Sequence, residues 1–157
     1  MLNLPAHARV WVYPAHRPLN KEEAVQATTA AKAFTKQWTA HNHLLKADAI
    51  VLHQQFLILA VDESAAGASG CSIDSSVHFV RQLGVELGVD FFDRMRFSYR
   101  HRGDKIVTSS REDFKSAYST GEINDQTIVF DPLVKTAGDL VEQFERPLAE
   151  SWHRRMV

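Results

Sequence analysis

Two short apolar runs, placed between two helical patterns, constrain the fold of this chain more than any other feature. The runs are AIVL at 49–52 and FLILAV at 56–61, and only His53, Gln54 and Gln55 separate them. Apolar runs of four to eight residues rich in Val, Ile and Phe are typical of strands. A link this short favours an antiparallel hairpin. Since the link contains no Gly or Asn, one long bent strand over 49–61 stays open as an alternative.

A helical pattern lies on each side of this pair. Before it, Asn20 and Glu23 have capping-box spacing, and apolar residues then recur at steps of three or four. After it, one helical face carries Ile73, Val77, Val80, Leu83 and Leu87, and Gly88 ends the pattern. We expect helices near 20–42 and 73–88. Both should pack on the same face of one sheet of at least four strands, because two apolar stripes need a common surface to cover.

The remaining apolar runs, helix caps and prolines predict the other strands and helices of the chain. Strands are expected at 8–13, 94–101, 105–108 and 127–131, a short helix over 111–118, and a last helix from Thr136 through Trp152. Pro147 must kink or divide that last helix, since proline lacks the N–H that a helix interior needs. The resulting fold class is α+β: a ferredoxin-like (split βαβ) core of order β-α-β-β-α-β with a C-terminal β-α-β-α extension, built on an antiparallel or mixed sheet.

Composition sets limits on the class of protein. A chain of 157 residues with 45% hydrophobic residues is long enough for a single domain, 1–157, with its own core. The net charge of −1 argues against coating nucleic acid through bulk charge, and we expect no nucleic-acid partner. No apolar run reaches the roughly 18 residues of a membrane span. With no signal peptide and one cysteine, the chain is expected to be cytoplasmic and free of disulfides.

The segment DESAAGASGCSIDSS at 62–76 is the strongest candidate for a site. It leaves an apolar strand and enters a helix, whose free N–H groups attract anions. Two glycines would let the backbone approach a ligand closely. We therefore expect a small anionic ligand at the loop 62–74. The expected ligand-binding residues are Asp62, Glu63, Gly67, Ser69, Gly70, Cys71, Ser72 and Asp74.

The only cysteine of the chain falls within this loop. Cys71 stands at the expected helix start, which favours a thiolate, and His78 follows about two turns later on the same face. These two residues are the candidates for catalysis, although nearby carboxylates oppose the thiolate. The alternative is a structural turn in which Ser72 caps the helix and Cys71 is a small buried side chain. Neither a phosphate-binding P-loop nor a metal-ligand spacing occurs, so no cofactor and no metal are expected.

Residues 94–101 alternate strictly between two kinds of side chain. Arg94, Arg96 and Arg100 should face solvent, while Met95 and Phe97 should be buried. Such an arginine face could bind a phosphate backbone, or it could protect an edge strand from aggregation. A further alternative is a non-enzymatic interaction protein that forms a homodimer through an open sheet face or edge.

Several stretches resemble a small uncharacterised bacterial protein family. They are NLPAHARVWVY at 3–13, QWTAHNHLLKA at 37–47, DESAAGA followed by SGCSIDSSVHF at 62–79, and GVDFFDRMRFSYR at 88–100. Members of this family look like stand-alone proteins of similar length, some of which carry the label ABC transporter ATPase. The present chain lacks a Walker A lysine loop and an LSGGQ-like signature. The resemblance therefore indicates a family, but it implies no activity for this chain.

Overall fold

The computed structural model describes residues 1–157 and contains an antiparallel sheet at its centre. Its strands are β1 (Arg9–Pro14), β4 (Lys46–Leu52) and β5 (Phe56–Asp62), in the order β1-β5-β4. The hairpin expected over 49–61 is confirmed, with Leu52 opposite Phe56. At its tip His53 and Gln54 both take a φ of 53°, as in the primed turns that match the strand twist.

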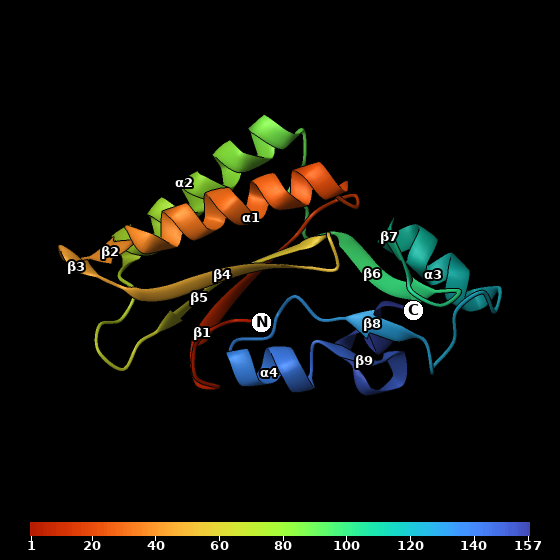
Figure 1. Cartoon of the computed structure of the whole chain (residues 1–157). Helices are drawn as coiled ribbons and strands as arrows, with labels where there is room; N and C mark the ends of the chain where they lie inside the picture. The colour runs from red at the N-terminus through yellow and green to blue at the C-terminus, as the bar shows by residue number, and fades with distance from the viewer.

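Two helices cover one face of this sheet, as expected (Figure 1). They are α1 (Lys21–Lys36) and α2 (Gly70–Leu87), and apolar residues of both join one core cluster with Leu57 and Leu59. The predicted capping box of Asn20 and Glu23 is present. The predicted end of α1 near 42 is wrong. A small hairpin, β2 (Thr39–Ala40) and β3 (His43–Leu44), takes over those residues.

The opposite face of the sheet is covered by the C-terminal part of the chain. All seven residues of β5 are buried, so neither face of this strand meets solvent. Val12 and Ile58 pack there with Phe130, Phe144 and the helix α4 (Ala137–Glu142). The molecule is therefore layered here: two helices, the sheet, and then the C-terminal segment.

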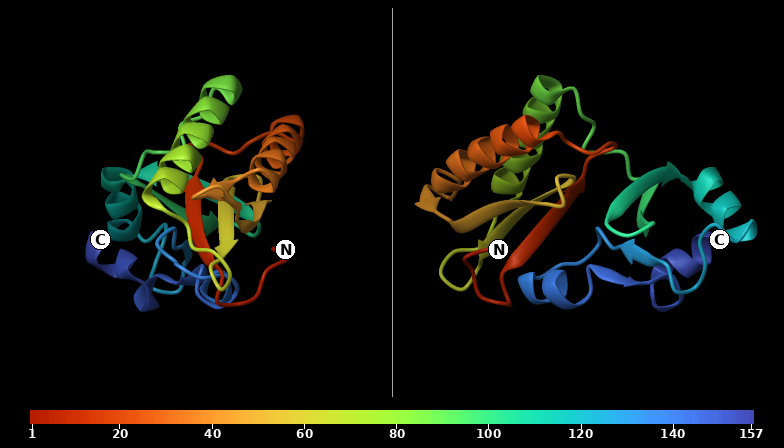
Figure 2. Two further views of the ribbon diagram at one scale, coloured as in Figure 1. Left: turned by 90° about the vertical axis from the view of Figure 1, so that its left-hand side faces the viewer. Right: turned by 45° about the vertical axis from the view of Figure 1, so that its right-hand side comes forward.

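A second antiparallel sheet lies beside the first one (Figure 2). Its strands are β6 (Arg96–His101), β7 (Lys105–Ser110), β8 (Ile128–Phe130) and β9 (Glu145–Pro147), in the order β7-β6-β8-β9. The helix α3 (Arg111–Ser119) packs on it, with Phe114 against Phe97 and Tyr99. The prediction of an α+β fold with antiparallel sheets is confirmed.

Three expectations about these later elements are wrong. The strand at 94–101 does not join the first sheet, so the sheet beneath the two helices has three strands and the ferredoxin-like order is incomplete. Met95 is 65% exposed, because β6 begins only at Arg96. The last helix ends at Glu142, and the chain continues as β9 and the 3₁₀ turns Leu148–Glu150 and Trp152–Met156. Pro147 closes β9, where its missing N–H costs little.

None of the four α-helices combines the length and the apolar character that crossing a membrane requires.

Candidate functional site

The loop before α2 is organised by its own hydrogen bonds. Ser69 caps the helix, and not Ser72 as in the alternative of a structural turn: the Ser69 side chain accepts from the Ser72 N–H at 3.1 Å. The Ser72 hydroxyl in turn accepts from the Ser69 N–H. Ser72 is therefore the third helical residue and completes a reciprocal pair of the capping-box type.

The two carboxylates at the start of the loop also bond within it. Buried Asp62 accepts from the Ser64 N–H at 3.0 Å and from the Ser64 hydroxyl at 2.7 Å, and these bonds lower its pKa to about 2. Glu63 accepts from the Ala68 N–H at 2.9 Å. A Cβ at Gly67 would lie 3.1 Å from the Glu63 carboxylate, so the glycine makes room for this bond.

Cys71 and His78 are exposed on α2, seven positions apart. The alternative of a buried cysteine is therefore wrong. Gly70 and Asp74 are exposed on the same first turns of the helix. None of these four residues lines the two cavities described next. Of the loop residues that were expected to bind a ligand, only Glu63 lines one of these cavities.

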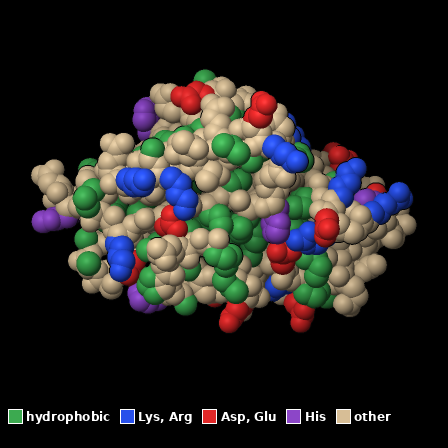
Figure 3. Space-filling view, in the orientation of Figure 1, with side chains coloured by type: hydrophobic (Ala, Val, Ile, Leu, Met, Phe, Trp, Pro, Cys, Tyr) green, Lys and Arg blue, Asp and Glu red, His purple; other side chains and the backbone are tan.

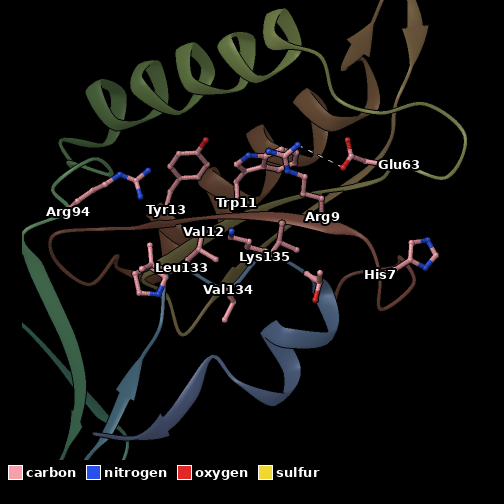
Figure 4. Close-up of a pocket in the computed structure, with 13 residues that line it drawn as sticks. His7, Arg9, Trp11, Val12, Tyr13, Glu63, Arg94, Leu133, Val134 and Lys135 are labelled. Atoms are coloured by element: carbon pink, nitrogen blue, oxygen red, sulfur yellow. Dashed lines mark ion pairs between the residues drawn. The ribbon is translucent and has the colours of Figure 1, made fainter. Parts of the chain in front are cut away.

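The first of these cavities, which we name the β1-edge cleft, has a volume of about 600 Å³. It runs along the outer edge of β1 (Figure 4). Arg9, Trp11, Tyr13 and Arg94 lie on the side of β1 that faces α2, and Leu133 and Val134 lie on the other side. The remaining lining residues are His7, Val10, Val12, Glu63, Pro132, Lys135 and Thr136.

The cleft exists because the chain after β8 leaves β1 after a short contact. The Val10 N–H donates to the Lys135 carbonyl at 2.9 Å, and Arg9 and Thr136 form an isolated antiparallel bridge. The pairing does not continue to Val12. Peptide groups two residues apart on a strand point the same way, so the N–H and C=O of Val12 face the cleft as those of Val10 face Lys135.

Cationic side chains outnumber anionic ones in the cleft. The Arg9 guanidinium lies 4.6 Å from the centre of the Trp11 ring and 3.9 Å from the Glu63 carboxylate. Arg94 and Lys135 are exposed and have no carboxylate oxygen within 4.0 Å. The cleft therefore presents two unneutralised positive charges to a ligand.

The second cavity, which we name the apolar cavity, has a volume of about 320 Å³ and adjoins the cleft. Arg94, Pro132 and Leu133 line both. Five of its sixteen lining residues are aromatic, namely Phe56, Phe91, Phe97, Phe130 and Trp152, and four are charged, namely Asp93, Arg94, Arg96 and Arg111. His153 also lines it and is fully buried, and burial lowers the pKa of its imidazole to about 4. The ring is therefore neutral at pH 7.

The predicted arginine face is divided in the structure. Arg96 donates to Asp93 at 2.9 Å, and Arg100 donates to Glu145 at 2.6 Å and lies over the Phe130 ring. Arg94 precedes β6 and belongs to the two cavities instead. Sequence reasoning missed Arg9, Lys135 and His153, which no local motif connects with Arg94.

No protein-family model, curated protein or solved structure matches this chain. The resemblance to a bacterial family therefore stays a prediction. No group of three or more His, Cys, Asp or Glu side chains lies close enough together to hold a metal ion.

Proposed function

We propose that this protein binds a small anionic ligand in the β1-edge cleft. Arg94 and Lys135 would hold the negative charge, and the free N–H of Val12 would donate to an oxygen of the ligand. The observation that carries the proposal is the pair of cations without a carboxylate partner beside a cleft of about 600 Å³. A volume of this order is typical of small-molecule sites.

The proposal moves the expected anion site away from the start of α2. Glu63 would limit one end of the cleft and orient Arg9, while Asp62 would fix the loop that carries Glu63. The N-terminus of α2, where Gly70 and Cys71 are exposed and Ser72 is buried, is the alternative position for the anion.

Titration with pyrophosphate and with citrate tests the proposal, with amide chemical shifts as the readout. Arg94→Gln and Lys135→Gln should each weaken binding about tenfold, the value of one charge-assisted hydrogen bond. The matched controls are Arg102→Gln and Lys115→Gln, which remove exposed cations outside the cleft. Equal weakening by the controls would show nonspecific attraction. Shift changes confined to residues 69–74 would favour the α2 N-terminus instead.

A second candidate is a non-enzymatic interaction protein that forms a homodimer. What supports it is a different surface, where hydrophobic side chains gather between β4 and α4 (Figure 3). A groove of about 530 Å³ lies there, lined among others by Leu2, Leu4, Ile50, Leu52, Leu140 and Val141. Sedimentation across a hundredfold range of concentration should then show a dimer that Val141→Glu dissociates. A monomer at every concentration would exclude it.

A further inference from the structure

The walls of the apolar cavity come from both sheets and from the last turn of the chain. Phe56 on β5 lies with its ring centre 5.0 Å from that of Phe130 on β8. On the far side, Trp152 stacks on His153 with ring centres 3.9 Å apart. Because these rings pack against one another in the core, the cavity is already formed without a ligand. Its volume of about 320 Å³ is near the lower limit of small-molecule sites.

One polar group in this aromatic surrounding lacks a partner. His153 is 0% exposed, and its Nε2 has no hydrogen-bond partner. Its Nδ1 lies 2.6 Å from the Ser151 hydroxyl, which also accepts from the His153 N–H at 3.4 Å. We assign the Ser151 hydroxyl as the donor to Nδ1, because the structure gives this hydroxyl no other acceptor. The neutral ring then carries its own hydrogen on Nε2, which is a free donor.

Other residues that line this cavity are exposed and charged. Arg94 and Arg111 line the cavity, are exposed, and have no carboxylate oxygen within 4.0 Å, whereas Arg96 and Asp93, which also line it, form an ion pair with each other. The apolar side chains of Met95 and Leu133 line the same cavity and are 65% and 55% exposed. The cavity therefore combines two exposed cations, buried aromatic side chains and one fully buried histidine nitrogen without a partner.

We propose that the apolar cavity binds the ring of a small heteroaromatic acid. The flat ring would lie among the phenylalanines, and its nitrogen or carbonyl oxygen would accept from Nε2 of His153. The acid group would remain at the mouth, between Arg94 and Arg111. This ligand class rests on the proposed function only for the acid group, because Arg94, which would bind that group, lines both cavities. The ring and its acceptor depend on the apolar cavity alone.

Two acids of the same shape test this directly with the full chain. Quinoline-6-carboxylate carries a ring nitrogen that 2-naphthoate replaces with carbon. Wild-type protein should bind the quinoline acid about fivefold more tightly, the contribution of one net hydrogen bond. His153→Phe keeps an aromatic ring but removes the donor, so it should make the two affinities equal. The control His78→Phe, at an exposed position on α2, should leave the ratio unchanged.

A measurement on the wild type covers the case in which His153→Phe does not fold. The imidazole ¹⁵N resonance of His153 Nε2 should shift with the quinoline acid and much less with the naphthoate. Equal affinities for both acids in the wild type, or no binding of either, would overturn the inference. If pyrophosphate still binds in a manner that depends on Lys135, the β1-edge proposal survives that failure. If Lys135→Gln does not change the affinity for pyrophosphate, while the wild type binds the quinoline acid more tightly than the naphthoate, only the ring site survives.

Discussion

Acidification below pH 6.5 should destabilise this protein through His153. The side chain is fully buried beside Phe97, Phe114 and Trp152, and burial lowers its pKa from 6.5 to about 4. The charge of Arg146 lowers the pKa further, and that of Asp131 opposes this. Between these two pH values the unfolded chain binds the proton and the folded chain does not. The free energy of unfolding must therefore fall as the pH falls.

The size of the effect follows from the two pKa values. One pH unit between folded and unfolded pKa is worth about 1.4 kcal/mol, so a fall from 6.5 to about 4 corresponds to about 3 kcal/mol. About 2 kcal/mol of this should already be lost at pH 5. Such a loss is a large part of the roughly 5–15 kcal/mol by which domains are stable.

Urea denaturation of the wild type and of His153→Gln at pH 7, 6, 5 and 4 measures this contribution. Glutamine does not titrate, and the effects of the carboxylates are common to both proteins. The difference in unfolding free energy, wild type minus variant, should fall by about 2 kcal/mol between pH 7 and pH 5. The control His78→Gln changes an exposed histidine and should show no such trend. A difference independent of pH would refute the buried, neutral state of His153.

Two further changes test the helix α2. Cys71 is exposed, so iodoacetamide should alkylate it fully without denaturant, and protection from alkylation would contradict its position. Gly84→Ala would place a Cβ 2.5 Å from the Val89 carbonyl oxygen and should cost about 1–3 kcal/mol in urea denaturation. Gly70→Ala meets nothing within 4 Å and should change stability by less than about 0.5 kcal/mol; equal losses for both would contradict the packing at Gly84.

Local patterns in the sequence determined the elements in which neighbours along the chain act together. The capping box of Asn20 and Glu23 and the left-handed Gly88, with a φ of 66°, depend on side chains and dihedrals within one turn. The hairpin of β4 and β5 likewise follows from two apolar runs with a short link. Its turn contains no glycine. His53 and Gln54 accept a positive φ because the burial of β5 on both faces fixes the pairing around them.

Only the tertiary structure decided which partners the later strands take. The alternation at 94–101 placed Phe97 and Tyr99 inside correctly, but a period of two is the same in either sheet. It could not show that β6 pairs with β7 and β8 and leaves the outer edge of β1 open. Met95 was misplaced because the pattern does not mark where a strand begins.

The sequence could not predict the candidate site either, because the site also depends on which distant segments come together. Arg9, Arg94 and Lys135 come from three separate segments, and each by itself is an ordinary surface cation. His153 follows Pro147, where the expected helix gives way to β9 and two 3₁₀ turns that bury the imidazole beside the second sheet. Caps and turns are set by neighbours along the chain, whereas a cleft is set by where distant segments part. Here it opens where the chain after β8 leaves β1.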